Sequence, residues 1–248
     1  GYTEVVRNFY SQTRIDQSQD ADGLGPVRKM VHGSITHGEQ YLNHPKRATA
    51  YYCERTGIGR ALQSLPTDRP RKLGVVGLGA GTLAVYGRPG DEMRLYEIND
   101  QVLDLARRHF TFLADSAART VPVLGDGRLM LEAEAPQAFD LLAMDAFSGD
   151  SIPTHLLTLE AFDAYQRHMR PDGLLAVHIT NTYLDLRPVM ASAAEHLGKV
   201  ALRLELPSGH GDPFCRRSSW VVFVNPAQAA NLPPRLQGAE VLQPRPGF

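Results

Sequence analysis

The pattern of hydrophobic positions changes near residue 73, where short apolar runs begin to alternate with longer stretches of helical spacing. Short apolar runs that end at polar residues or glycine are typical of the buried strands of a parallel sheet. Five such strands are predicted, at residues 73–76, 93–97, 121–124, 141–145 and 174–179. Helices are predicted between them, at 81–86, 99–114 and 158–169. A helix at 186–197 and strands at 200–206 and 220–224 follow, and two consecutive strands would close this α/β sheet with an antiparallel edge.

The two ends of the chain have other patterns. The first 65 residues alternate apolar and polar positions with breaks at Gly33 and Gly38, which predicts a small β-hairpin lobe and a linking helix at 51–62. The last 23 residues contain five prolines and little periodicity, so we expect a loose surface tail. The predicted units are a lobe at 1–65, an α/β domain at 66–225 and a tail at 226–248.

Composition narrows the classes of function. The 248 residues carry 26 Lys and Arg against 27 Asp and Glu, and this balance argues against an extended phosphate-binding surface, so we expect no nucleic-acid partner. No apolar stretch approaches the roughly 20 residues that a membrane-spanning helix needs. Cys53 and Cys215 lie far apart without a CxxC motif, so we expect neither a disulfide nor a zinc site. These features predict a soluble protein of a reducing compartment, the cytoplasm.

A glycine-rich turn follows the first strand of the α/β series. Gly77, Gly79 and Gly81 stand at alternate positions where a strand should turn into a helix. Without side chains there, a ligand can lie against backbone N–H groups at the helix start. A tight turn without a ligand would use glycines as well. The GxGxG spacing differs from the GxGxxG of dinucleotide sites and favours a nucleoside without a pyrophosphate.

Acidic residues end the next three strands. Glu97 lies at the distance downstream at which a carboxylate meets ribose hydroxyls, and Asp126, between two glycines, can reach the exocyclic amine of an adenine. Asp145 directly follows a buried strand, where partial desolvation can raise the pKa of a carboxyl toward that of a useful base. Each of these acids has an alternative role as a helix cap or turn residue. Their shared position at one edge of the sheet favours a ligand site.

These residues resemble those of the spermidine synthase (polyamine aminopropyltransferase) family, a branch of the class I methyltransferase-like fold. The resemblance covers most of residues 25–224. In the sheet it is carried by Gly77-Leu-Gly-Ala-Gly81, Tyr96-Glu-Ile98, Gly125-Asp-Gly127, Met144-Asp-Ala-Phe-Ser-Gly-Asp150 and Pro171-Asp-Gly173. In the lobe it is carried by His32-Gly-Ser-Ile-Thr-His-Gly38 and Tyr51-Tyr52. It implies a seven-stranded Rossmann sheet with one antiparallel edge behind a small β-hairpin lobe.

The resemblance also implies roles for individual residues. S-adenosylmethionine or its decarboxylated form would lie over the three glycines of the turn. Glu97 would hold the ribose, Asp126 would bind the adenine, and Asp145 would help to deprotonate the attacking amine. The other implied contacts are Ile98, Gly127 and His37 with the nucleoside, Tyr52 in catalysis, and Tyr51, Glu39 and Asp150 with the amine substrate.

One position departs from the family pattern. Ordinary spermidine synthases carry an aspartate in the glycine turn that holds the cationic end of the decarboxylated nucleoside, and here that position is Ala80. Loss of a desolvated charge partner typically removes several kcal/mol of discrimination. The choice between the two nucleosides therefore stays open at the level of sequence.

Four activities remain open. The leading hypothesis is transfer of an aminopropyl-type group to a polyamine, with release of methylthioadenosine. A lyase or cyclase reaction without an acceptor is the second, because Ala80 leaves the amino end of the substrate free to fold back. Methyl transfer is the third, although the Asp145 segment and the lobe resemble the aminopropyl branch. The fourth is a sensor domain that binds a nucleoside or a polyamine without turnover.

The lobe also contains a histidine cluster. His32, His37, His44 and Glu39 could together hold a transition metal. On a hairpin, however, His32 and His37 need not share a face. We therefore expect no metal, and we expect His37 or Glu39 to face the substrate.

Two expectations concern partners. The family resemblance implies a homodimer. The chain begins with Gly rather than Met, and its segments at 32–38 and 145–150 look like those of domains fused behind multi-helix membrane regions. This favours the cytosolic domain of an integral membrane protein as an alternative to a free cytoplasmic enzyme.

Overall fold

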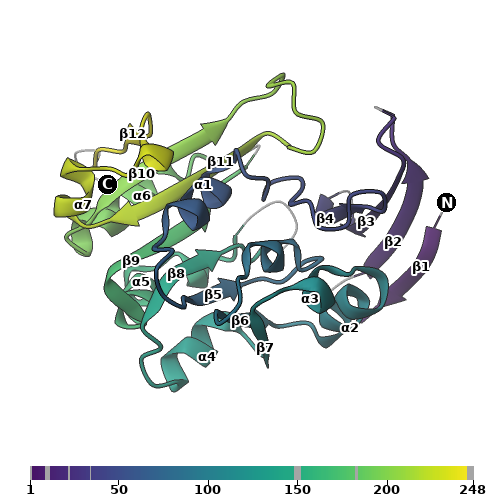
Figure 1. Cartoon of the computed structure of the whole chain (residues 1–248). Coiled ribbons are helices and arrows are strands. Elements are labelled where there is room, and N and C mark those ends of the chain that lie inside the picture. The colour runs from purple at the N-terminus through teal and green to yellow at the C-terminus, as the bar shows by residue number, and fades with distance from the viewer. Residues whose placement is uncertain are drawn as a thin grey trace.

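The computed structural model describes residues 2–8, 12–21, 23–33, 35–147, 152–181 and 184–244. Within them the strands form two sheets, which Figure 1 shows side by side. The smaller sheet is antiparallel in the order β1-β2-β3-β4. Its strands are β1 (Tyr2–Arg7), β2 (Gln12–Gln19), β3 (Pro26–His32) and β4 (Ile35–Tyr41). The predicted hairpin lobe is therefore a four-stranded sheet.

The larger sheet has the order β12-β10-β11-β9-β8-β5-β6-β7. The five strands predicted from short apolar runs pair in parallel: β5 (Lys72–Val76), β6 (Glu92–Glu97), β7 (Arg119–Leu124), β8 (Phe139–Met144) and β9 (Met169–His178). The antiparallel edge is formed by β10 (Val200–Leu206), β11 (Ser218–Val224) and the short β12 (Glu240–Val241). The predicted α/β sheet with an antiparallel edge is confirmed, and among the described residues it has eight strands instead of seven because β12 adds to the edge.

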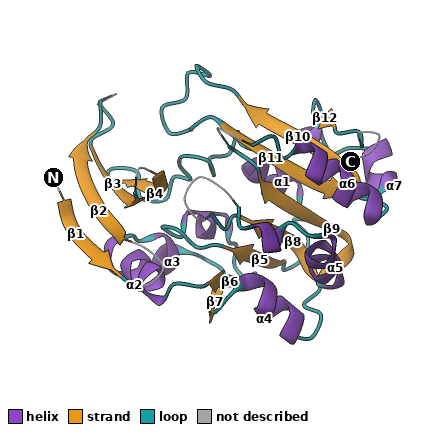
Figure 2. Cartoon of the chain, turned by 180° about the vertical axis from the view of Figure 1, so that it is seen from behind, coloured by secondary structure: helices purple, strands orange, loops and turns teal. Residues whose placement is uncertain are grey.

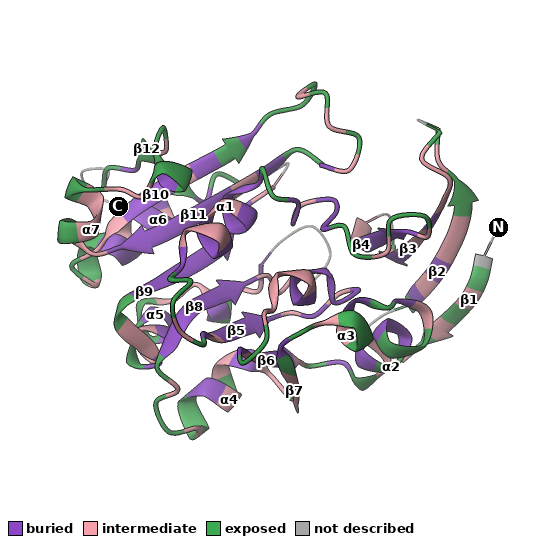
Figure 3. Ribbon diagram, viewed as in Figure 1, coloured by how far each residue is buried: buried purple, intermediate pink, exposed green. Residues whose placement is uncertain are grey.

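Helices cover both faces of the larger sheet, and Figure 2 shows them from behind. One apolar cluster joins the sheet to α1 (Gly57–Ser64), the 3-10 turn η1 (Thr82–Tyr86), α2 (Asp100–His109) and α3 (Phe112–Asp115). A second cluster on the other face joins it to α4 (Gly127–Ala133), the 3-10 turn η2 (Thr154–Leu156), α5 (Leu159–Arg167) and α6 (Arg187–His196). The central strands are accordingly buried, as Figure 3 shows. Among the described residues, no helix is long and apolar enough to cross a membrane.

The linking helix begins later than its apolar spacing predicts. Thr56 caps α1 by accepting a hydrogen bond from the backbone N–H of Gly59, so residues 51–56 form turns ahead of the helix. This arrangement places Tyr51 and Tyr52 in an irregular segment, where they are free to turn toward the sheet.

The tail is not loose in its described part. It forms α7 (Pro226–Ala230), the 3-10 turn η3 (Pro234–Leu236) and β12. Leu236 is buried in the main core, and Arg60 of α1 donates hydrogen bonds to the carbonyls of Arg235 and Gln237 at 2.6 and 2.7 Å. Proline here starts short helical turns, and the apolar Leu236 fixes the segment to α1.

Cys53 and Cys215 form a disulfide, so the expectation of unpaired cysteines is wrong. They are 162 residues apart in sequence, but the backbone of Ala50 bonds to Phe214 and Arg216 and brings the two Cα atoms to 5.5 Å. The distance between the two cysteines in the sequence does not reveal such a pairing. The pairing depends on the path in space of the loop between β10 and β11. The prediction of a reducing compartment rests on unpaired cysteines, so the disulfide removes this support for it.

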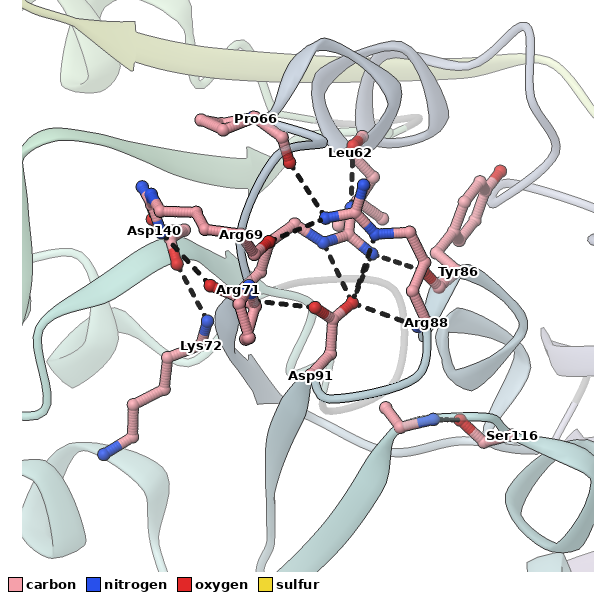
Figure 4. Close-up of polar contacts among 12 residues, drawn as sticks. Leu62, Pro66, Arg69, Arg71, Lys72, Tyr86, Arg88, Asp91, Ser116 and Asp140 are labelled. Carbon is pink, nitrogen blue, oxygen red and sulfur yellow. Dashed lines mark hydrogen bonds and ion pairs between the residues drawn. The ribbon is translucent and has the colours of Figure 1, made fainter.

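A buried ion pair joins the amino ends of β5 and β6, the edge of the sheet where the parallel strands begin (Figure 4). Asp91 accepts hydrogen bonds from the Arg71 guanidinium at 2.6 Å and from the backbone N–H groups of Arg71 and Arg88. Beside it, Asp140 pairs with Arg69 at 2.6 Å. Removal of either partner of the Arg71–Asp91 pair would leave a buried charge without compensation, which is strongly destabilising.

Candidate active site

A cavity of about 250 Å³ lies between the lobe and the carboxyl ends of β5, β6 and β8. This volume is near the lower end for small-molecule sites. Two hydrogen bonds join the lobe to the larger domain beside this cavity. The Gln40 side chain of β4 donates to the Thr111 hydroxyl at 2.9 Å, and the Arg28 side chain of β3 donates to the carbonyl of His109 at 2.6 Å. The cavity is therefore at the edge of a parallel sheet where ligands usually bind.

The glycine turn is in close contact with β4. The backbone N–H of Ala80 donates to the carbonyl of His37 at 3.3 Å. A Cβ atom at Gly79 would lie 2.2 Å from that carbonyl oxygen, so only glycine fits there. Gly77 and Gly79 line the cavity, whereas Gly81 lies outside its lining and begins η1.

Glu97 lies at the end of β6 and is held by the glycine turn. Its carboxylate accepts hydrogen bonds from the backbone N–H groups of Leu78 at 3.0 Å and Asn99 at 2.9 Å. Burial raises the pKa of Glu97 above its usual range, although these N–H donors oppose the shift. Each carboxylate oxygen has a further lone pair, so both remain able to accept a ribose hydroxyl.

Asp126 has two roles in the structure. It is the N-cap of α4, with its Oδ1 accepting from the backbone N–H of Leu129 at 3.1 Å. Its Oδ2 lies 2.9 Å from Nε2 of His155, a half-exposed side chain at the rim of the cavity. The cap that sequence offered as an alternative is thus present together with a position on the cavity wall.

Asp145 follows β8 and lies at the centre of a hydrogen-bonded group. Its Oδ2 accepts from the Tyr52 hydroxyl at 2.6 Å, and its Oδ1 lies 2.7 Å from Nδ1 of His178. Burial and the adjacent carboxylate raise the pKa of Tyr52 well above its usual value, so the phenol keeps its proton and donates it. Two donors therefore fix the orientation of the Asp145 carboxylate.

His178 is a site residue that the sequence analysis missed. Its ring stacks on Trp220 with the centroids 4.4 Å apart and an angle of 4° between the planes. Its Nε2 lies 2.7 Å from the Thr180 hydroxyl, and Thr180 also accepts the N–H of Ser219. Since Nδ1 faces a carboxylate, the tautomer with hydrogen on Nδ1 fits best. The sequence does carry a signal for this residue. His178 is the last residue of β9, as Glu97 is of β6, and Asp145 directly follows β8.

His37 reaches the cavity through a β-bulge in β4. Thr36 pairs with Val31 and Gly38 pairs with Met30, which leaves His37 as an extra residue. Its Nε2 is buried and has no hydrogen-bond partner among the described residues. Burial lowers the pKa of His37, and the neighbouring His32, whose ring lies 5.4 Å away, lowers it further.

A second buried carboxylate lies farther along β4. Glu39 is 1% exposed; its Oε2 accepts from Arg216 at 3.1 Å and pairs with Lys29 at 3.8 Å. Its Oε1 is buried without a partner in the described part of the chain. Burial, with the charge of Glu39, raises the pKa of Tyr51. The centroid of the Tyr51 ring lies 5.5 Å from that of His178, so Tyr51 is beside the group around Asp145.

The structure brings most of the predicted site residues together. Lining the cavity are Gly77, Gly79, Glu97, Ile98, Asp126, Gly127, Asp145 and His37. Outside its lining, among described residues, are Gly81, Tyr51, Tyr52 and Glu39. Asp150 lies outside the described residues. In the part of the chain that is described, no group of three or more His, Cys, Asp or Glu side chains is arranged to hold a metal ion.

Comparison with curated proteins finds relatives of two kinds. The chain is 28% identical over 121 residues to a polyamine aminopropyltransferase of Vibrio vulnificus, which covers 46% of this chain and 39% of that protein. It is 28% identical over 161 residues to putrescine N-methyltransferase 2 of Nicotiana attenuata, which covers 63% of this chain and 43% of that protein. The matches thus span less than half of these relatives. No protein-family model matches the chain.

Solved structures show the same fold. A probable spermidine synthase from Corynebacterium glutamicum superposes with a TM-score of 0.66 over 96% of this chain and 88% of that chain, at 19% identity. The spermidine synthase of Thermotoga maritima gives a TM-score of 0.61 over 95% of this chain and 80% of its own, at 16% identity. Sequence and fold together confirm that this chain is similar to the spermidine synthase-like family.

Proposed function

We propose that this chain is a transferase that takes a sulfonium nucleoside, moves its aminopropyl-type group to a polyamine and releases methylthioadenosine. The observation that carries the proposal is the position of Asp145, which lines the same cavity as Glu97 and Asp126. Its carboxylate is oriented by Tyr52 and His178. A base at this point faces the place where an amine would meet the nucleoside.

The proposed reaction mainly requires that the amine be held in line with the carbon that it attacks. In the proposed step the lone pair of a neutral amine attacks the carbon next to sulfur, and the electron pair of the carbon–sulfur bond goes to sulfur. The sulfonium becomes a neutral thioether, and the proton lost by the amine goes to Asp145. With Glu97 on the ribose and Asp126 on the adenine, the sulfur would be directed toward Asp145.

The amine side of the site is assigned to Glu39 and Tyr51. A polyamine carries ammonium groups, and the buried Oε1 of Glu39 is an acceptor without a partner among the described residues. Arg216 and Lys29 balance part of the Glu39 charge, so an incoming ammonium would share this carboxylate with them. Asp150 stays a prediction for the same role.

The relatives support both the substrate class and one competing activity. Aminopropyl transfer agrees with the relative named a polyamine aminopropyltransferase, and with a structural neighbour described as a spermidine synthase in complex with the transition state analogue AdoDATO. Methyl transfer is the second candidate, because the putrescine N-methyltransferases match a longer stretch of this chain. Both activities need a sulfonium nucleoside and an amine.

Product analysis tests the proposal. The protein is incubated with S-adenosylmethionine or with its decarboxylated form, each with and without putrescine or spermidine, and the products are identified by mass. Methylthioadenosine that forms only with an amine supports the proposal. Methylthioadenosine without an amine indicates a lyase, S-adenosylhomocysteine indicates methyl transfer, and no product in any mixture contradicts all three. Asp145→Asn is the matched control for contaminating activity.

A further inference from the structure

The wall that the lobe contributes to the cavity differs in charge from the opposite wall. Glu97 and Asp126 line the cavity beyond the carboxyl ends of the strands. Among the described residues of the lobe that line it, the only titratable ones are His32 and His37. The two rings are stacked, and both residues line the cavity together with Gly77 and Gly79. The backbone of His37 lies against the glycine turn, because its carbonyl accepts the N–H of Ala80.

Position 80 contributes no charge to this end of the cavity. Ala80 is 1% exposed and does not line the cavity. Its Cβ points at β4, since a Cβ atom placed on Gly38 would lie only 2.5 Å from it. An acidic side chain at position 80 would therefore meet the backbone of β4. If the end of the nucleoside carries only an ammonium group, the described residues of the lobe wall offer it no carboxylate.

His37 has an unsatisfied group at this place. Its Nε2 is buried and has no partner among the described residues, which is unfavourable unless a ligand supplies one. A carboxylate is a suitable partner, because it accepts a hydrogen bond from an imidazole N–H and favours the protonated ring. That preference opposes the effect of burial, which lowers the pKa of His37 in the free protein.

We infer that this site selects intact S-adenosylmethionine over the decarboxylated nucleoside, by binding the α-carboxylate at His37 and His32. The inference rests on the proposed function, since it assumes that a sulfonium nucleoside occupies the cavity. The α-ammonium group is common to both nucleosides and does not discriminate between them. The carboxylate is the group that differs, and the lobe wall provides the imidazoles of His32 and His37, which can donate hydrogen bonds to it.

Calorimetry on the whole chain tests the inference. Dissociation constants are measured for S-adenosylmethionine, decarboxylated S-adenosylmethionine and methylthioadenosine, which lacks the amino acid part. We expect S-adenosylmethionine to bind about tenfold more tightly than the decarboxylated form, as for one charge-assisted hydrogen bond. In His37→Phe this preference should disappear, while the far-UV circular dichroism spectrum shows that the variant is folded. His196→Phe, on the surface of α6, is the matched control and should keep the preference.

The outcomes separate this inference from the proposed function. If methylthioadenosine binds, but the decarboxylated nucleoside binds as tightly as S-adenosylmethionine or more tightly, the inference is wrong and the nucleoside site stands. A preference that survives in both His37→Phe and His32→Phe also overturns it. If none of the three ligands binds the wild-type protein, the proposed function and the inference both fail.

Discussion

The Tyr52 hydroxyl donates a 2.6 Å hydrogen bond to Oδ2 of Asp145, and this contact joins the segment after the lobe to the end of β8. The two residues are 93 positions apart in sequence. Burial keeps the Tyr52 phenol protonated by raising its pKa, so it acts as a donor throughout the physiological range. The proposed base is therefore oriented by a residue from outside the larger sheet.

Replacing the proposed base should affect turnover and not nucleoside binding. In Asp145→Asn the side chain keeps its shape but cannot take the proton of the amine, so we expect turnover to fall by at least about a hundredfold. The affinity for methylthioadenosine should stay nearly intact. Steady-state kinetics and calorimetry measure the two quantities, and an unchanged kcat would exclude Asp145 as the base.

His178 should act as a positioning residue through its 2.7 Å contact with Asp145. In His178→Leu the carboxylate loses one charged hydrogen bond, and we expect kcat to fall about tenfold or more. The KM for the nucleoside should change little. His178→Asn offers an N–H at the position of Nδ1 and should recover most of the loss. Equal losses in the two variants would show that His178 matters only for packing against Trp220.

Binding of the ribose should depend on pH through Glu97. Burial raises the pKa of this carboxyl, so it becomes protonated at a higher pH than an exposed glutamate does. The anion accepts hydroxyl hydrogen bonds better than the acid, so affinity for methylthioadenosine should decrease as the pH falls through that raised pKa. Calorimetry between pH 8 and about 5 measures this, above the usual value of about 4.3 for Glu. Glu97→Gln should bind more weakly and lack this component; an identical pH dependence would disprove the assignment.

The disulfide should contribute to stability. It joins residues 162 positions apart, and the loss of chain entropy in the unfolded state predicts a stabilisation of about 3 to 5 kcal/mol. Denaturant unfolding of the double variant Cys53→Ala, Cys215→Ala measures the difference. A reductant should lower the stability of the wild-type protein and leave the double variant unchanged. If the reductant has no effect on the wild-type protein, the cysteines do not form this bond in solution.

The ion pair at the opposite edge of the sheet should matter for folding alone. In Asp91→Asn the buried Arg71 guanidinium loses its charged partner, which typically reduces the free energy of unfolding by about 3 to 5 kcal/mol. The exposed pair of Asp104 with Arg108 is the matched control, and Asp104→Asn should change stability by less than about 1 kcal/mol. Affinity for methylthioadenosine should be the same in both folded variants. A loss of affinity in Asp91→Asn alone would contradict the separation of the two edges.

The carboxylates of the site could be predicted because of a general property of parallel sheets. Glu97 ends β6, and Asp126 and Asp145 follow β7 and β8. The carboxyl ends of parallel strands meet at one edge of a sheet, so these three residues line the same cavity. The same rule applied to β9 would have identified His178. The parallel sheet with its antiparallel edge followed from the apolar runs and from the family resemblance, whereas the order of the strands comes from the structure alone.

Contacts between distant segments could not be predicted in the same way. The Cys53–Cys215 bond and the Arg216–Glu39 pair depend on the path of the loop between β10 and β11, which has no periodicity to analyse. The place of His37 at the cavity was expected from the family resemblance, but the bulge that puts it there does not show in the alternation along β4. The prolines of the tail predict a loose segment, but in the structure they begin short helical turns. The buried Leu236 packs this segment into the same apolar cluster as α1.

The central claim is that one rim of the sheet holds an adenosine with its sulfur toward Asp145. A crystal structure of the protein with methylthioadenosine tests it most directly. We expect the adenine amino group at Asp126, the ribose hydroxyls at Glu97 and the sulfur on the side of Asp145. A nucleoside bound elsewhere, or bound in the cavity with its sulfur directed away from Asp145, would contradict it.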